Sequence, residues 1–171
     1  PFNEPFSASL PNCWSMSGGE NWLFNTSGPN HVGNGGSLSG STTSGGHYAV
    51  VDASGHSGDA ILSSPNVDIS SLTNPELSFF LISDNEGTPY SSTLTVMVNG
   101  SMAASYTGNT NGWEQKIIDL STYTSPVQVD FVFSEPTTGS AFYDDFRRAT
   151  PRVKSLQYAD LGFSRKRLWL W

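Results

Sequence analysis

Residues 127–133 read Val-Gln-Val-Asp-Phe-Val-Phe, and this alternation of apolar and polar side chains decides the fold class. Successive side chains of a strand point to opposite faces, so Val127, Val129, Phe131 and Phe133 share one face. A period of two kept over seven residues predicts a strand that packs on a core with one side.

The same alternation recurs along the chain. Residues 77–82 (Leu-Ser-Phe-Phe-Leu-Ile) and 94–98 (Leu-Thr-Val-Met-Val) repeat it, and Asn99-Gly100 after the second run is typical of a tight hairpin turn. Shorter strands are expected over residues 46–51, 59–62, 115–120 and 141–146. No stretch of residues 1–146 keeps a helical period over three turns. The sequence therefore predicts an all-β, antiparallel two-sheet β-sandwich, a jelly roll of the concanavalin-like or galactose-binding-like kind.

Charge divides the chain into two parts. The 171 residues carry 15 acidic and 8 basic side chains, for a net charge of −7. Residues 1–146 hold 14 of the acids and a single basic residue, Lys116, whereas residues 147–171 hold seven basic residues and one acid. We therefore expect a domain over 1–146 and a basic tail over 147–171. The tail is a linker to a further domain, a non-native segment, or a segment that docks on the acidic domain or on an anionic partner. The acidic domain argues against nucleic-acid binding, which needs clustered Lys and Arg.

Compartment follows from composition. Ser, Thr, Asn and Gly dominate residues 1–146 while Lys and Arg are nearly absent, which suits a secreted or cell-surface protein, one that we expect to form part of a larger multidomain protein. No apolar run reaches the roughly 18–20 residues that span a bilayer. Cys13 is alone, so it forms no internal disulfide, and we expect it to be a small buried hydrophobe.

A series of short motifs resembles the MAM domain family of extracellular adhesion modules. The motifs stand in the family's order over about residues 2–146: Phe2-Asn3-Glu4, Leu10 with Cys13 and Trp14, Trp22, Gly28-Pro29-Asn30-His31, Gly46-His47-Tyr48, residues 60–65, residues 75–79, Trp113, Ile118-Asp119-Leu120 and residues 141–146. The resemblance implies a jelly-roll fold and an extracellular adhesion or binding role. The family's paired cysteines are missing, because Pro75 or Glu76 stands where the partner of Cys13 would fall, so the chain is closer to disulfide-free microbial modules.

A structural Ca²⁺ is the main cofactor expected. Asp144 shares strand parity with Phe142 and Phe146, so it points toward the core if those rings do, and a buried carboxylate needs a partner or a metal. First and last strands of a jelly roll commonly lie side by side, which would bring Glu4 to Asp144, and the resemblance implies a Ca²⁺ near these elements. Asp52 and Asn30 are lesser candidate ligands. The competing interpretation is that Asp144 and Asp145 cap a strand end.

No catalytic constellation stands out. The three histidines, at positions 31, 47 and 56, are scattered, and Glu4, Glu20, Glu86 and Glu114 show no pairing across a cleft. Trp14, Trp22 and Trp113 are expected in the core, whereas Tyr90, on an expected loop, is the candidate for stacking on a sugar.

Three functions are therefore considered. The first is a non-catalytic, MAM-like adhesion or binding module whose partner is an extracellular protein or glycan. The second is a carbohydrate-binding module accessory to a secreted enzyme. The third, less favoured, is a small jelly-roll enzyme that acts on a polysaccharide.

Overall fold

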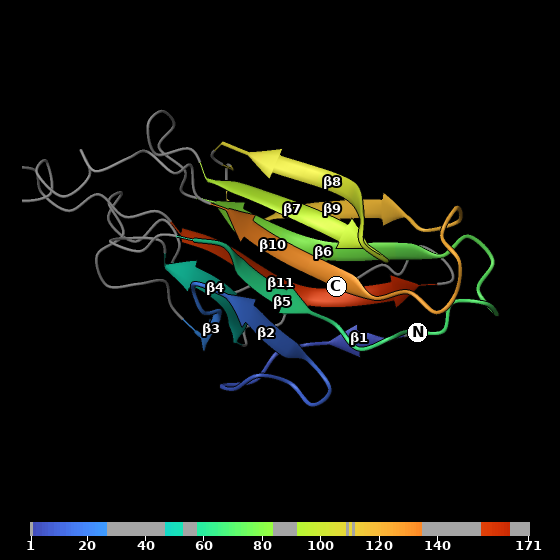
Figure 1. Cartoon of the computed structure of the whole chain (residues 1–171), viewed down its shortest axis with the longest axis horizontal. Coiled ribbons are helices and arrows are strands. Elements are labelled where there is room, and N and C mark those ends of the chain that lie inside the picture. Colours follow the sequence, from blue (N-terminus) through green and yellow to red (C-terminus); the bar gives the residue numbers. More distant parts are fainter. Residues whose placement is uncertain are drawn as a thin grey trace, which may run out of the picture.

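The computed structural model describes residues 2–26, 47–52, 58–83, 92–108, 110, 112–134 and 155–164, with the backbone alone described at residue 52 and over 155–164. Two antiparallel sheets face each other (Figure 1). The first has the order β3-β4-β11-β6-β9, with β1 paired to β11: β1 Asn3–Glu4, β3 Leu23–Asn25, β4 Tyr48–Asp52, β6 Glu76–Ser83, β9 Glu114–Asp119 and β11 Ser155–Ser164. The second has the order β2-β5-β10-β7-β8: β2 Ser15–Gly18, β5 Ala60–Ser63, β7 Thr93–Val98, β8 Ser101–Thr107 and β10 Val129–Ser134.

The predicted all-β sandwich of jelly-roll type is confirmed, and alternation along the central strands explains it. Leu77, Phe79 and Leu81 of β6 and Phe131 and Phe133 of β10 are all at most 1% exposed. The rings of Phe79 and Phe131 meet edge to face, with centroids 5.4 Å apart and planes at 82°. This aromatic pair joins the two sheets at the centre of the core, where such contacts add to the stabilisation from burial.

The hairpin predicted at Asn99-Gly100 joins β7 to β8. Both residues have positive φ, 50° and 76°, which is the backbone conformation that a two-residue turn of this kind requires. The Asn99 side chain donates to the carbonyl oxygens of Thr124 and Pro126 and accepts from the amide of Gln128, so it ties the turn to the chain before β10. The turn therefore fixes the register of β8, a strand that was not predicted.

Strand β4 is buried on both faces. Ala49 and Val51 belong to the main core, whereas Tyr48 and Val50 form a second apolar cluster with Trp113, whose ring lies 5.4 Å from that of Tyr48. Trp14 and Trp22 lie in the main core, as expected, at 6% and 1% exposure. Trp113 is only partly buried and packs against the second cluster instead.

The expected burial of Cys13 is wrong. This residue is exposed and has a φ of 67°. It lies in a turn closed by a hydrogen bond from the Trp14 amide to the Pro11 carbonyl, 3.1 Å long. The turn places the large Trp14 ring in the core and leaves the neighbouring thiol in solvent.

Strand β11 comes from the segment 147–171 that the sequence analysis set apart as a basic tail. Its residues 155–164 pair with β4 on one side and with β6 on the other, and Asn3 and Glu4 of β1 pair with Gly162 and Leu161. First and last strands therefore do lie side by side, but the last strand described is β11. Residues 141–146, the strand expected there, lie outside the described residues, and the boundary at residue 146 stays a prediction.

Within the part of the chain that the structure describes, no helix is long and apolar enough to cross a membrane.

An exposed carboxylate at the end of the sandwich predicts acid sensitivity. Asp68 accepts hydrogen bonds from the side chain and amide of Ser70 and from the Ser125 hydroxyl, which lower its pKa from 3.8 to about 2. Because the folded-state pKa is depressed, this stabilisation is complete above the unfolded value and is lost as the pH falls from about 4 to 2. We expect Asp68→Asn to flatten the fall of stability over that interval, measured by urea unfolding at a series of pH values. An unchanged pH dependence would show that Asp68 contributes nothing.

Candidate functional site

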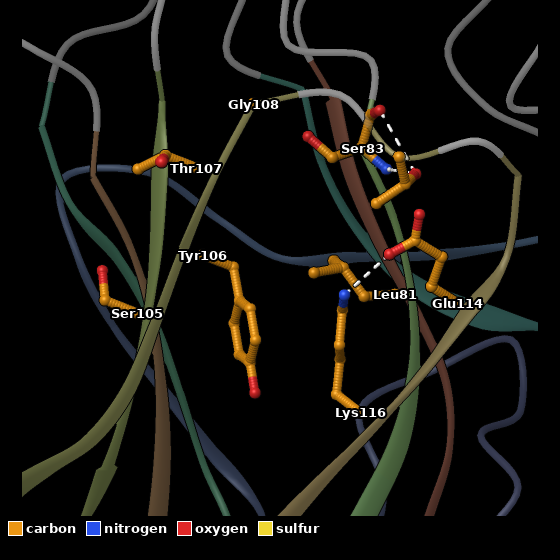
Figure 2. Close-up of a pocket in the computed structure, with 9 residues that line it drawn as sticks. Leu81, Ser83, Ser105, Tyr106, Thr107, Gly108, Glu114 and Lys116 are labelled. Carbon is orange, nitrogen blue, oxygen red and sulfur yellow. Dashed lines mark hydrogen bonds and ion pairs between the residues drawn. The ribbon is translucent and has the colours of Figure 1, made fainter.

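A polar pocket of about 260 Å³ lies along one edge of the sandwich, between β8 of one sheet and β9 of the other (Figure 2). Figure 1 shows the two strands at the same edge. Its lining residues come from β6, β8, β9 and the chain after β8: Leu81, Ser83, Ser105, Tyr106, Thr107, Gly108, Thr110, Glu114 and Lys116. Both strands end their sheets, so the inner layer of the sandwich is open to solvent at this edge.

Two charged side chains occupy positions that face the sandwich interior. Glu114 pairs with Leu81 of β6 and Lys116 with Phe79, and residues directly opposite in a ladder share a face. Ile118, the next residue of that face, is 8% exposed, whereas the intervening Ile117 is 57% exposed. The apolar inner face of β9 therefore becomes charged toward the pocket.

The two charges form an ion pair beside an aromatic ring. The Lys116 Nζ donates to the Glu114 Oε2 over 2.7 Å, with the two side chains 22% and 39% exposed. The same nitrogen lies 5.3 Å from the centroid of the Tyr106 ring, within the range of a cation–π contact. Figure 2 shows the three side chains converging from the two edge strands. They place a cation, an anion and a ring at one point of the edge.

The Tyr106 ring is held in place by the hydrophobic core. Its ring packs edge to face on Phe79, with centroids 6.0 Å apart and planes at 79°. Burial raises the pKa of its hydroxyl above the ordinary value of 10, so the phenol stays protonated and can both donate and accept hydrogen bonds. The contact with the core fixes the ring and leaves no need for a ligand to order it.

Thr110 closes the end of the pocket. Its Oγ1 accepts from the Ser83 amide over 2.8 Å, and its amide donates to the Ser83 carbonyl over 3.0 Å. These bonds clamp the chain after β8 onto the end of β6. The connection between β8 and β9 is therefore tied at Thr110 to the end of β6.

This arrangement suits a ligand rich in hydroxyl groups. An ammonium offers three donors, a carboxylate only acceptors, and a hydroxyl can satisfy either. Hydrogen bonds to charged groups contribute about 1.5–3 kcal/mol each. The Tyr106 ring adds an apolar surface of the kind that sugar rings stack on.

Glu4, the first predicted metal ligand, is positioned by β1. Its Oε1 accepts a hydrogen bond from the Phe6 amide over 2.9 Å. Burial raises the pKa of this carboxyl, and the Phe6 hydrogen bond partly offsets that rise. The carboxylate is thus partly desolvated and keeps lone pairs for a further partner.

The structure does not bring Asp52 to Glu4. Asp52 pairs with Ser155 and Glu4 with Leu161, six residues further along β11, which corresponds to roughly 20 Å at about 3.3 Å per residue. Calcium binds its oxygen ligands at about 2.3–2.6 Å, so one ion cannot join the two residues.

The remaining predicted site residues, Asp144, Asn30 and Tyr90, lie outside the described residues. Among the residues that are described, no three or more His, Cys, Asp and Glu side chains cluster closely enough to hold a metal ion. The calcium site therefore stays a prediction that depends on Asp144.

The pocket was not predicted, although the sequence carries a signal for it. Lys116 is the sole Lys or Arg of residues 1–146, and it lies two residues after Glu114, which directly precedes the strand predicted over residues 115–120. What the sequence could not provide is the position of β8 and β9 at the same edge of the sandwich, in different sheets, which brings Tyr106 to Lys116.

The sequence matches no protein-family model and no curated protein. Solved structures share the fold. The K1 cleaved adhesin domain of Lys-gingipain from Porphyromonas gingivalis W83 aligns over 97% of this chain and 98% of its own, with a TM-score of 0.61 and 12% identity. The K3 cleaved adhesin domain of the same protein aligns over 94% and 96%, with a TM-score of 0.60 and 14% identity. TmCBM61, solved in complex with β-1,4-galactotriose, aligns over 91% and 90%, with a TM-score of 0.51 and 10% identity. At these identities the likeness establishes the jelly-roll fold alone.

Proposed function

We propose that this chain is a non-catalytic binding module of a secreted or cell-surface protein, and that it binds a glycan in the pocket between β8 and β9. The observation that carries the proposal is the Glu114–Lys116 pair, which faces the sandwich interior beside the Tyr106 ring. Placing a charged pair on the inner face removes apolar burial and partly desolvates two charges, which costs free energy. Hydrogen bonds to a ligand would explain why the pair is kept there.

The lining of the pocket supports binding over hydrolysis. Glycoside hydrolysis ordinarily uses two carboxyl groups about 5–9.5 Å apart. Glu114 is the sole carboxylate among the residues described as lining the pocket. The polysaccharide-active enzyme is therefore the weaker proposal.

Fold and composition support the setting. The shared jelly roll with two adhesin domains and with a galactotriose-bound module agrees with adhesion or sugar binding as the role. The ordered motifs of residues 2–146 support a MAM-like, disulfide-free module, and we place it outside the cell as part of a larger protein.

A glycan array tests the binding function. We expect the protein to bind a restricted set of glycans, and Tyr106→Ala to lose that binding while Tyr106→Phe, which keeps the ring, retains most of it. Binding that is unaffected by Tyr106→Ala would contradict the pocket as the site. If no glycan binds while an extracellular protein partner does, the partner is a protein and the glycan proposal fails.

A structural Ca²⁺ held by Glu4 and Asp144 is part of the proposal, because Glu4 is a partly desolvated carboxylate next to the last described strand. Binding to the folded state alone stabilises by RT ln(1 + [L]/Kd), about 2.7 kcal/mol at a hundredfold excess over Kd. We expect EDTA to lower the melting temperature and Ca²⁺ to restore it, with the response abolished by Asp144→Asn.

The neighbouring substitution Asp145→Asn is the matched control and should leave the calcium response intact. A melting temperature that is the same with and without EDTA would contradict the ion.

A further inference from the structure

We infer that the pocket between β8 and β9 selects a single, uncharged sugar unit at the end of a glycan chain. This inference rests on the proposed glycan-binding function and adds the class of sugar and the part of the chain that is recognised. It follows from the charge balance, the size and the position of the pocket.

The described lining carries one cation and one anion, already 2.7 Å apart. A sugar hydroxyl can accept from the Lys116 ammonium or donate to the Glu114 carboxylate, so vicinal hydroxyls can join the pair without breaking it. A carboxylate or sulfate on the ligand has acceptors only. It could accept only from Lys116, and there it would lie beside the like-charged Glu114 carboxylate.

The rest of the domain opposes an anionic ligand as well. Residues 1–146 hold 14 acidic side chains and Lys116 as the sole Lys or Arg. The long-range field of such a surface lowers the local concentration of anions. Among the residues whose side chains the structure describes, Lys116 is the sole Lys or Arg, and it is already paired with Glu114.

The apolar part of the lining suits the C–H face of one ring. Leu81 at the floor is 1% exposed, and the Tyr106 ring stands next to it, backed by Phe79. Side chains alternate along β8, so Ser105 and Thr107 point away from the face that Tyr106 lines, and they contribute mainly backbone to the rim. The accessible part of the lining therefore offers the ligand one aromatic ring and one charged pair.

Size limits the ligand to about one sugar ring. The pocket volume of about 260 Å³ lies below the roughly 300–1,000 Å³ of pockets that enclose drug-sized ligands. The Thr110–Ser83 clamp closes one end, so a chain does not run through the pocket. A small, partly open recess that is bounded at one end suits a chain end better than an internal segment.

Isothermal titration calorimetry on the full chain tests this inference, with the glycan identified by the array as the reference ligand. The probes are methyl glycosides of neutral hexoses and pentoses, their uronic acid counterparts, and neutral oligosaccharides of one to six units. We expect the preferred neutral glycoside to bind at least tenfold more tightly than its uronic acid, and affinity per chain to change less than threefold with length.

The substitution Glu114→Gln separates a role in ligand selection from a purely structural role, because only the first predicts a change in the preference between neutral and acidic sugars. It releases Lys116 from its partner, so we expect the uronic acid to gain at least fivefold in affinity while the neutral sugar loses affinity. Ile117→Ala, on the exposed face of the same strand, is the matched control and should change neither.

The outcomes separate this inference from the proposed function. An acidic glycan that binds the wild type as tightly as the neutral one, or an affinity that rises tenfold or more from one unit to four, would overturn the inference and leave glycan binding standing. Absence of binding to every glycan would overturn both.

Discussion

The double substitution Glu114→Gln/Lys116→Met is expected to weaken glycan binding at least tenfold, while it changes the free energy of unfolding by less than about 1 kcal/mol. The two effects differ because the pair does different things in the two processes. Partly exposed ion pairs contribute only about 0–1 kcal/mol to folding, since water screens them. Hydrogen bonds from charged groups to ligand hydroxyls contribute about 1.5–3 kcal/mol each.

Titration calorimetry measures the first effect and urea unfolding the second. Ile117→Ala serves as the control on the same strand and should retain wild-type affinity. A double variant that binds normally would remove the pair from the site. One that loses several kcal/mol of stability would mean that the pair serves the fold.

Removing residues 155–171 is expected to abolish cooperative unfolding. Strand β11 lies between β4 and β6, and its loss leaves two strands in the middle of the first sheet without their shared neighbour. Each net backbone hydrogen bond contributes about 0.5–1.5 kcal/mol, and β11 pairs along nearly its whole length. The loss is comparable to the roughly 5–15 kcal/mol that stabilises a typical domain.

The shorter truncation, which removes residues 165–171 alone, keeps β11 and is the control. We expect it to unfold with the wild-type midpoint in circular dichroism or calorimetry. If the chain that ends at residue 154 unfolds as cooperatively as the control, β11 is dispensable, and the boundary predicted at residue 146 is favoured instead.

The long central strands were predictable because burial on one face writes a period of two into the sequence. Residues 77–82 and 94–98 lie within β6 and β7, and residues 129–133 of the run 127–133 lie within β10. The Asn99-Gly100 turn was predictable because its positive φ values select those residues.

The edge strands were not predictable in the same way. Strand β8 reads Ser-Met-Ala-Ala-Ser-Tyr-Thr and is half exposed, with Met102 67% exposed, so its pattern carries little burial signal. Strands β1 to β3 have two to four residues each, too few for a period to be visible. Strand β11 escaped prediction because its basic surroundings favoured a tail.

The pocket could not be predicted for the same reason. It is formed where two edge strands of different sheets meet, and the contact between Tyr106 and Lys116 depends on a register that no local pattern encodes. The residue types themselves were visible, since a lone lysine in an otherwise acidic domain is a chemical anomaly. The sequence thus singled out Lys116, and the structure was needed to show that Glu114 and Tyr106 lie beside it.

Chemical-shift mapping by ¹⁵N-resolved NMR, with the array-identified glycan added to the full chain, tests the account most directly. We expect the largest amide shifts to cluster on Ser105–Gly108 at the end of β8 and on Glu114–Lys116 of β9, and to vanish in the Glu114→Gln/Lys116→Met variant. Shifts that cluster on another face of the sandwich, with these amides unmoved at saturation, would contradict it.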